Sequence, residues 1–178
     1  MKRARNASSE ILAAAREVTA RQGAGNLTID SVAREIGMSK GGVLYNFPSK
    51  KALLSALLQE MIEEHLVSMS EIDQAKLNAT LRRHLHSFIA ENDLKADLSM
   101  AILAAAAENP ELLDPLRNMI ESDQRKVTSE TTDPIGAQVI LAALDGLRFQ
   151  HLLCMPPYDT KTRGAIQDRI GSMIDDLR

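Results

Sequence analysis

The sequence predicts an all-α fold of about nine helices, arranged as a small N-terminal domain (1–51) and a larger C-terminal helical domain (52–178). Apolar residues recur at helical spacing along nearly the whole chain, which is the primary signal for amphipathic helices. Ala, Leu, Ile and Met dominate the apolar set, aromatic residues make up only 3%, and Trp is absent. This composition favours helix, and no run of alternating β-branched residues predicts a strand.

The first helix is expected from Ser9 or Glu10 to about Arg21, with Gly23 and Gly25 ending it. Glycine ends helices well because it adopts the left-handed conformation without a Cβ penalty. The apolar face of this helix, which should brace the next two helices, consists of Ile11, Leu12, Ala15 and Val18.

The second helix is expected to begin after Thr28, because a threonine hydroxyl at the N-cap can accept a hydrogen bond from the first turn. Leu27 and Val32 occupy the two positions of a hydrophobic staple. Gly37 ends this short helix, and Ser39 is a second N-cap two residues later. The order of helix, glycine-containing turn and helix is the signature of a helix-turn-helix.

The third helix is expected from Lys40 to Asn46, because Pro48 cannot continue a helix and disfavours helical geometry at the residue before it. Ser49 then caps a long fourth helix. This fourth helix is either a rigid lever between a ligand site and the N-terminal domain or a simple connecting helix. Its apolar stripe contains Leu54, Leu57, Leu58, Met61, Ile62, His65, Leu66 and Met69.

Charge separates the two domains. Residues 1–51 contain nine Lys or Arg against four Asp or Glu, a net charge of +5, and the remainder contains twelve basic against twenty acidic residues, a net of −8. This asymmetry indicates a basic, nucleic-acid-facing module attached to an acidic body. The alternative is an ordinary helical hairpin with no role in DNA binding.

The first fifty or so residues resemble the N-terminal domain of the TetR family of bacterial transcriptional regulators. The resemblance rests on the segments ILAAAREV, TIDSVAREIGMSKGG and NFPSKKALL, and on a glycine before the capping threonine. It implies sequence-specific binding to double-stranded operator DNA, usually by a repressor. One position departs from the family, which usually has Tyr three residues before the Phe of this motif. Leu44 stands there and the tyrosine follows at Tyr45, so the family's contact is not transferred to Leu44.

The predicted DNA contacts fall into three groups. The first group lies near helix ends, where phosphates lie, and carries hydroxyl, amide or ammonium groups. Its members are Thr28, Ser39, Tyr45, Asn46 and Lys50. The recognition helix itself presents Lys40, Gly41, Gly42 and Leu44. Each glycine costs about 1 kcal/mol of helix stability relative to Ala, so the pair either lets DNA approach the backbone or permits tight packing. The third group is either a basic arm along the DNA or a solvated tail, and it consists of Lys2, Arg3 and Arg5.

Five more helices are expected in the C-terminal domain. Their ranges are Lys76–Glu91, Leu94–Ala107, Pro110 to about Val127, Pro134–Cys154, and Thr160 to the end, with a polar break over Thr128–Asp133. The Leu94–Ala107 helix is nearly all apolar after Asp97, so it should be buried on most sides.

The last two helices predict a homodimer. Both carry apolar residues beyond what one domain needs, and a four-helix bundle with a second copy would bury them. TetR-family dimers use their last two long helices in this way, so the resemblance implies the same interface. A two-fold dimer would read a palindromic operator. The alternative is that both helices pack on their own domain. The predicted interface consists of Ile135, Val139, Ala142, Ala143, Gly146, Leu147, Ile166, Ile170, Met173, Ile174 and Leu177.

The resemblance also implies an effector pocket in the C-terminal domain. Because few charged residues are candidates for burial there, we expect a small apolar or aromatic effector, bound by adaptable Met-rich walls. Ordinary core packing is the alternative role for each of these residues. The predicted lining is Met61, His65, Met69, Phe88, Met100, Leu103, Met119, Leu144, Phe149 and His151.

Other functional classes find little support. His84 and His86 are two residues apart and point in different directions on a helix, and no Gly-rich phosphate loop or catalytic triad pattern occurs, so we expect neither an enzyme nor a cofactor. His151 and Cys154 could form half of a zinc site, which makes a metal-responsive regulator one alternative and a helical protein-binding adaptor another. The single cysteine and the lack of a membrane-length apolar run predict a cytoplasmic protein.

Overall fold

The computed structural model describes residues 2–70, 77–89, 94–153, 155–156 and 158–177, with the side chains of 2–6, 24, 68–70 and 94–97 left out. Within these ranges the fold is entirely helical, as predicted, with nine α-helices and no strand. None of the helices in the described part of the chain has the length and apolar character needed to cross a membrane.

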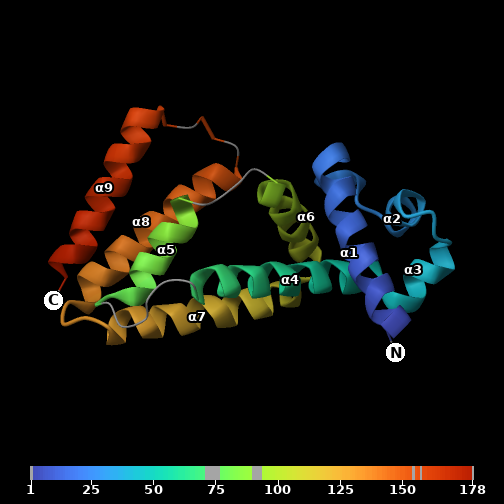
Figure 1. The fold of residues 1–178 in the computed structure, drawn as a ribbon, viewed down its shortest axis with the longest axis horizontal. Coiled ribbons are helices and arrows are strands. Elements are labelled where there is room, and N and C mark those ends of the chain that lie inside the picture. Colours follow the sequence, from blue (N-terminus) through green and yellow to red (C-terminus); the bar gives the residue numbers. More distant parts are fainter. Residues whose placement is uncertain (1, 71–76, 90–93, 154, 157, 178) are drawn as a thin grey trace. The chain divides into compact units, whose positions relative to one another are not determined.

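Figure 1 shows the elements in chain order. They are α1 (Lys2–Gln22), η1 (Ala24–Asn26), α2 (Ile29–Glu35), α3 (Lys40–Asn46), α4 (Lys50–Ser70), α5 (Ala79–Ile89), α6 (Leu94–Glu108), η2 (Pro110–Leu113), α7 (Asp114–Ser129), α8 (Pro134–Leu152) and α9 (Thr160–Asp176).

Three helix starts differ from the prediction. Helix α5 begins at Ala79 rather than at Lys76, after a turn at Leu77 and Asn78. The first helix begins at Lys2 rather than at Ser9 or Glu10, so the segment predicted as an arm or tail is helical. Lys, Arg and Ala are good helix formers, which explains the extension. The helix expected from Pro110 is divided into a 3-10 turn and α7. Pro115 lies in the first turn of α7, where its missing N–H costs no helical hydrogen bond.

The chain divides into two compact units. Unit 1 consists of Met1–Met61 with Asp93–Pro115, and unit 2 consists of Ile62–Asn92 with Leu116–Arg178. The division does not coincide with the predicted boundary after Lys51, because α4 runs through that point and α6 joins the unit that holds the helix-turn-helix. The functional assignment of 1–51 and 52–178 therefore stays a prediction.

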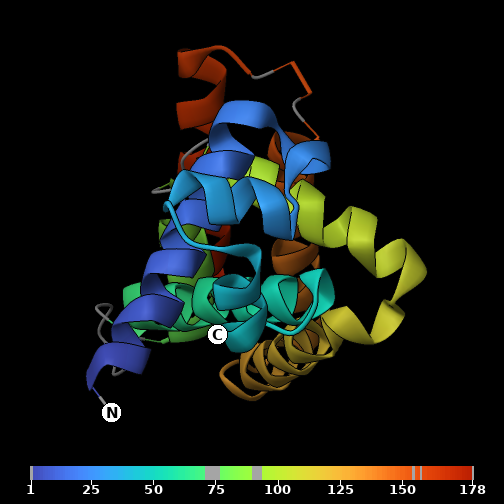
Figure 2. The same ribbon diagram turned by 90° about the vertical axis from the view of Figure 1, so that its right-hand side faces the viewer.

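Unit 1 holds the three N-terminal helices around a small core. Figure 2 shows α2 and α3, in light blue and cyan, beside α1. Helix α1 packs against α2, α3 and α6. We expected α6 to be buried on most sides, but Met100, Ala104 and Ala107 are exposed. The buried residues of α1 to α3 include Ile11, Ala15, Val18, Leu27, Val32, Val43 and Phe47.

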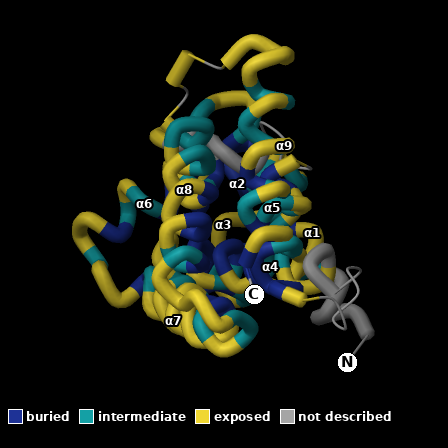
Figure 3. The backbone as a smooth tube through the Cα atoms, turned by 90° about the vertical axis from the view of Figure 1, so that its left-hand side faces the viewer, coloured by how far each residue is buried: buried dark blue, intermediate teal, exposed yellow. Residues whose placement is uncertain are grey.

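Unit 2 is built around one cluster that joins α5, α7, α8 and α9. Its buried members are Leu81, Phe88, Val127, Ala137, Ile140, Leu141, Leu144, Ile170, Ile174 and Leu177. Figure 3 shows this buried interior in dark blue beneath exposed stretches of α8 and α9.

Two polar side chains of unit 2 satisfy helix ends that would otherwise be unpaired. The buried Asn78 has a positive φ of 56° and donates from Nδ2 to the carbonyls of Ile174 and Leu177, both at 3.2 Å, at the end of α9. Glu130 accepts from the Thr80 backbone N–H at 2.7 Å and from its hydroxyl at 2.6 Å, at the start of α5. Such orphan groups need partners when they are buried.

Candidate nucleic-acid interface

The N-terminus of α2 is fixed by a reciprocal cap. Thr28 Oγ1 accepts from the Ser31 N–H at 3.0 Å, and Ser31 Oγ accepts from the Thr28 N–H at 2.9 Å. The predicted N-cap at Thr28 is therefore confirmed. The capping box itself was not predicted, because its usual third position is Glu or Gln and here it is Ser31.

The turn between α2 and α3 is a Schellman motif. Gly37 has φ +64°, the left-handed conformation that favours glycine. The Met38 N–H donates to the Ala33 carbonyl at 2.9 Å, and the Gly37 N–H donates to the Arg34 carbonyl at 3.4 Å. These bonds fix the direction in which the chain leaves α2, and therefore the angle at which α3 begins.

The recognition helix α3 has the predicted bounds. Ser39 is its N-cap, with the hydroxyl oxygen accepting from the Gly42 N–H at 3.1 Å. Val43 faces the core, and α3 ends before Phe47 and Pro48 as expected. Ser49 caps α4 by accepting from the Ala52 N–H at 3.0 Å. Caps, turn and proline together hold one exposed face of α3 in a defined orientation.

The two glycines of α3 differ in their surroundings. A Cβ on Gly42 would lie 2.7 Å from Met38 Cγ, so this glycine permits close packing of the turn. A Cβ on Gly41 would meet no atom closer than Ser39 Oγ at 4.0 Å, and Gly41 is exposed. Tight packing explains Gly42 but not Gly41, for which close approach of DNA stays a prediction.

Lys40 is exposed but not free. Its Nζ donates to Asp30 Oδ2 on α2 at 2.9 Å, and both side chains are 59% exposed. An exposed ion pair of this kind contributes about 0 to 1 kcal/mol. DNA can therefore displace Asp30 at little cost, and until then the pair keeps the lysine stem over the turn.

Asn46 is engaged within the protein. Its Oδ1 accepts from the Ser8 hydroxyl of α1 at 3.2 Å, and its Nδ2 donates to the Gly42 carbonyl at 2.9 Å. The amide therefore ties α3 to α1, which is a positioning role that the sequence did not indicate. The second N–H of Nδ2 takes no part in these two bonds, so Asn46 can keep both of them and still donate to a phosphate.

The remaining predicted contacts lie where DNA could meet them. Tyr45 is 88% exposed, the largest exposure among the big apolar side chains. Thr28, Ser39 and Lys50 are exposed, and Leu44 is half-buried. The side chains of Lys2, Arg3 and Arg5 lie outside the described residues.

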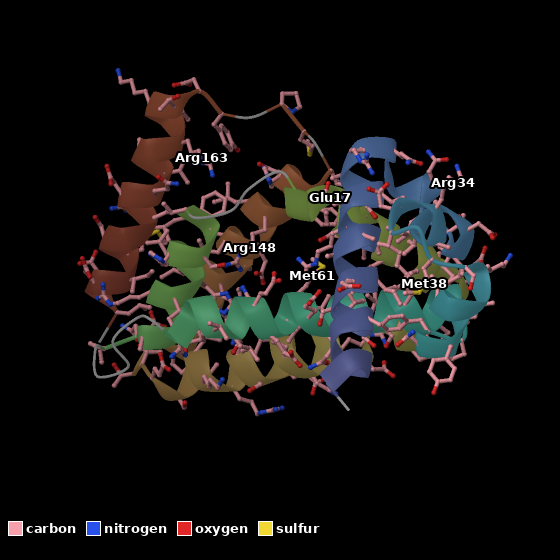
Figure 4. The ribbon with its side chains drawn as sticks, turned by 45° about the vertical axis from the view of Figure 1, so that its right-hand side comes forward. Glu17, Arg34, Met38, Met61, Arg148 and Arg163 are labelled. Carbon is pink, nitrogen blue, oxygen red and sulfur yellow. The ribbon has the colours of Figure 1, made fainter. Side chains whose placement is uncertain are left out.

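One exposed basic residue of the helix-turn-helix was not among the predicted contacts. Arg34 of α2 is exposed, and Figure 4 shows its side chain reaching outward from the helix. Among the described residues its guanidinium has no ion-pair partner, unlike Arg16, which binds Glu60, and Arg21, which binds Glu35. Basic residues are favoured in the last turn of a helix by the helix dipole, so Arg34 in the last turn of α2 gave no sequence signal for DNA contact.

The predicted dimer residues separate by helix. On α8, Ile135 and Val139 are 75% and 57% exposed, Ala142, Ala143 and Gly146 are also exposed, and Leu147 is half-buried. On α9 the expectation of an exposed stripe is wrong: Ile170, Ile174 and Leu177 are buried, and Ile166 and Met173 are partly buried against the same core. These α9 residues pack in the core of unit 2, because α9 covers the apolar cluster that it forms with α5 and α8.

The exposed face of α8 continues beyond the predicted set. Ile135, Val139, Ala142, Gly146, Phe149 and Leu153 alternate spacings of four and three residues, which is the repeat of a coiled-coil seam. Phe149 is 56% and Leu153 44% exposed. An open groove of about 750 Å³ lies between α8 and α9, with a mostly apolar wall that includes Ala143, Leu147, Ala165 and Ile166.

The residues of the predicted effector pocket come from both units, so the pocket stays a prediction. Met61, Met100 and Leu103 belong to unit 1, and His65, Phe88, Met119, Leu144, Phe149 and His151 belong to unit 2. Phe149 lies on the exposed face of α8, and Leu144 is fully buried in the core cluster. The Met69 side chain lies outside the described residues. A smaller hollow of about 330 Å³ in unit 1 contains none of the ten residues.

Unit 2 contains buried charge, contrary to expectation. His84 and Asp123 have side chains only 7% and 5% exposed, with Nε2 and Oδ2 3.3 Å apart. Arg148 of α8 reaches the same imidazole, and Figure 4 labels this arginine. No motif in the sequence marks this cluster, because its members come from three separate helices.

The described residues contain no group of three or more His, Cys, Asp or Glu side chains that could hold a metal ion. His151 is half-buried on α8. Its proposed companion Cys154 lies outside the described residues, so the metal-responsive alternative stays a prediction.

Comparison with known protein families decides the class. The family model for bacterial regulatory proteins of the tetR family matches residues 11–57, and the model for the tetracyclin repressor-like C-terminal domain matches residues 78–175. The chain belongs to the TetR family. It is accordingly a DNA-binding transcriptional regulator rather than an enzyme, and α3 lies within the matched DNA-binding region.

Solved structures agree with this TetR-family fold. A TetR transcription regulator from Haloarcula marismortui ATCC 43049 has a TM-score of 0.76 and 21% identity, with 97% of this chain and 99% of that chain covered. A transcriptional regulator from Rhodococcus sp. Rha1 has a TM-score of 0.74 and 21% identity, covering 96% and 97%. The multidrug binding protein EbrR complexed with ethidium has a TM-score of 0.67 and 25% identity, covering 92% and 98%. No curated protein matches the sequence significantly.

Proposed function

We propose that this TetR-family regulator is a repressor that binds a palindromic operator as a homodimer and leaves it when a small molecule binds unit 2. The observation that carries the DNA-binding part is the exposed face of α3. Its backbone is fixed by the Ser39 cap and the Gly37 turn, while Lys40, Gly41 and Tyr45 remain open to solvent. A recognition helix held in this way loses little freedom on binding.

Base reading and phosphate contact are assigned to different residues. Lys40 and the exposed Gly41 lie at the start of α3, the part that meets base edges when a recognition helix enters the major groove. Tyr45, Lys50, Thr28 and Arg34 are assigned to phosphates, which position a protein on DNA without reading sequence. Asn46 acts indirectly, by holding α3 against α1 through Ser8.

The homodimer is assigned to the exposed seam of α8. Six residues at coiled-coil spacing, four of them large and 44% to 75% exposed, form a long apolar face that a lone subunit leaves in water. The small side chains of Ala142 and Gly146 in the middle of this seam allow the two backbones to approach closely. The groove between α8 and α9 extends the same surface. A two-fold dimer presents two recognition helices about 34 Å apart, one turn of DNA.

The effector is a small organic molecule bound within unit 2. The similarity to EbrR, whose structures are complexed with imidazole, ethidium and malachite green, supports this class of ligand. Release from DNA requires that the effector prefer the conformation that does not bind the operator. The buried His84 and Asp123 argue against a purely apolar effector, because a polar group near them can replace their mutual contact.

Nuclease footprinting on DNA from upstream of the gene tests this proposal. We expect a protected segment with two-fold sequence symmetry and half-sites about 10 base pairs apart. A thermal-shift screen of small organic cations and aromatics should then find compounds that raise the melting temperature and remove the footprint. Protection without symmetry, or binding only by single chains, would refute the dimeric operator complex.

A further inference from the structure

Three helices of unit 2 meet at one buried imidazole. The His84 ring of α5 lies between Arg148 of α8 and Asp123 of α7. Arg148 Nη1 is 3.0 Å from His84 Nδ1, and Arg148 Nη2 donates to the His84 carbonyl at 2.7 Å. On the other side, His84 Nε2 is 3.3 Å from Asp123 Oδ2. We call Arg148, His84 and Asp123 the α8 latch.

The arginine fixes the tautomer of the ring. A guanidinium has only hydrogen-bond donors, so the ring nitrogen facing Arg148 Nη1 must accept. Nδ1 of His84 therefore carries no proton, and the proton of the neutral imidazole is on Nε2. That N–H faces the Asp123 carboxylate. His84 Nε2 and Asp123 Oδ2 are 3.3 Å apart without hydrogen-bond geometry, so the neutral ring is bonded to Arg148 of α8 and lies close to Asp123 of α7.

The surrounding charges are arranged on both sides of the ring. Burial raises the pKa of the Asp123 carboxyl, but the contact with His84, the charge that this ring carries once it is protonated, and the charge of Lys126 lower it more, so the pKa lies below its usual range. Lys126 Nζ is 3.5 Å from Asp123 Oδ1. Arg148 Nη1 also contacts Asp145 Oδ1 at 3.2 Å. The ring of His65, from α4, has its centroid 6.3 Å away.

We propose that the α8 latch is controlled by a proton: uptake of one proton at His84 Nδ1 expels Arg148 from α5. The imidazolium has two donors and no acceptor, so it cannot receive Nη1 of Arg148 and repels its charge. Arg148 moves to Asp145, which it already contacts, while the ring keeps Asp123 as its counter-charge. The proton comes from solvent, and only hydrogen bonds are exchanged.

The latch is placed to act on the proposed dimer surface. Arg148 lies on α8 between Gly146 and Phe149, which both face outward on the seam. Loss of the bonds from Arg148 to the His84 ring and carbonyl frees the last turns of α8 from α5. Protonation of His84 on acidification should therefore weaken the seam. The proton step is a property of unit 2 alone, whereas its effect on operator binding rests on the proposed function.

Nitrogen NMR of the whole protein tests the proton step without any variant. Two-bond ¹H–¹⁵N spectra at pH 8 should show His84 as the Nε2–H tautomer, and spectra at pH 5.5 should show a doubly protonated ring. A proton on Nδ1 at pH 8 would overturn the proposal, since Arg148 could not then be bound there. A ring that stays neutral at pH 5.5 would also overturn it.

Hydrogen exchange tests the release of α8. His84→Asn keeps an acceptor near Arg148 but does not titrate, and His86→Asn, two residues along on the exposed side of α5, is the matched control. We expect residues 144–153 to exchange about tenfold faster in wild type and His86→Asn than in His84→Asn at pH 5.5, with no difference at pH 8. Equal exchange in all three at pH 5.5 would refute the latch. Comparison at one pH removes the intrinsic pH dependence of exchange.

A second variant covers the case in which His84→Asn fails to fold. Arg148→Met removes the tie at every pH, so it should exchange at pH 8 as wild type does at pH 5.5. Operator affinity is measured in parallel by fluorescence anisotropy. If the latch works but the protein binds no operator, only the proposed function is refuted. If the latch works and operator binding does not change with pH, the effect of the latch is limited to unit 2.

Discussion

At the scale of single residues, the recognition helix illustrates how two identical amino acids take different roles. Gly42 is needed because a side chain there would press on Met38, whereas Gly41 has open space around it. A sequence pattern could not separate them, since the difference depends on where the Met38 side chain lies after the turn. The caps at Thr28, Ser39 and Ser49 were predictable because each depends on residues within three positions.

Substitution of Gly41 should separate stability from DNA binding. Gly41→Ala removes the entropic cost of glycine and meets no atom, so we expect the protein to be more stable by about 0.5 to 1 kcal/mol in urea unfolding. The added methyl group lies where DNA is proposed to approach, so operator affinity should fall. Unchanged operator affinity in this more stable variant would show that DNA does not come close to Gly41.

Lys40 and Asp30 should have opposite effects on operator affinity. Lys40→Ala is expected to weaken binding by about 1 to 3 kcal/mol, the usual value of a good base contact. Asp30→Asn removes the competing partner of Lys40 and one negative charge near the DNA, so binding should become a few times tighter. Gel-shift titrations of both variants check this, and weaker binding by Asp30→Asn would mean that the ion pair positions Lys40 rather than restrains it.

At the scale of elements, α8 and α9 show what an apolar stripe can and cannot reveal. Both stripes were read correctly as apolar faces, but periodicity does not say whether a face meets its own domain or another chain. The α9 stripe packs into unit 2, and the α8 seam stays exposed. The α8 latch was invisible in the sequence because His84 and Arg148 are 64 positions apart and form no recognisable motif.

The seam of α8 gives a direct test of dimerisation. Ala142 is exposed in the subunit, so Ala142→Glu should fold normally but place two carboxylates in the proposed interface. We expect sedimentation to find single chains for this variant and dimers for wild type. Ala107→Glu, at an exposed alanine of α6, is the control and should stay dimeric. Dimers of Ala142→Glu would move the interface away from this seam.

Asp123 should make stability depend on acid pH. Its pKa is lower in the folded chain than in the unfolded chain, so its contribution is present above the usual aspartate pKa of about 3.9 and is lost as pH falls through the lower, folded value. Urea unfolding from pH 7 to pH 3 should show wild type losing its advantage over Asp123→Asn as the pH drops below about 4. A constant difference between the two proteins would mean that the carboxylate gains nothing from His84 and Lys126.

At the scale of the whole molecule, charge divides the chain into a basic N-terminal segment and an acidic remainder. The whole chain carries a net charge of −3, which conceals the +5 of residues 1–51. The fold class, the helix bounds near the helix-turn-helix and the family could be predicted because they follow from local signals repeated along the chain. The effector site depends on which side chains of distant segments meet, which local signals do not give, so its predicted lining stays a prediction.

Salt should weaken operator binding steeply. Each phosphate neutralised by Lys or Arg releases condensed counterions, so the logarithm of the binding constant falls linearly with the logarithm of salt concentration. Lys50→Ala should reduce that slope by about 1 while lowering affinity for all sequences alike. Titrations between 50 and 200 mM salt check both effects, and an unchanged slope would remove Lys50 from the phosphate contacts.

The most direct test of the central claim compares two exposed tyrosines. Tyr45 on α3 is 88% exposed and Tyr158, before α9, is 46% exposed, so neither alanine substitution should disturb the fold. In fluorescence anisotropy titrations with upstream DNA, we predict that Tyr45→Ala binds at least fivefold more weakly while Tyr158→Ala binds like wild type, with both variants dimeric. Wild-type affinity in Tyr45→Ala would contradict the assignment of α3 as the helix that enters the DNA.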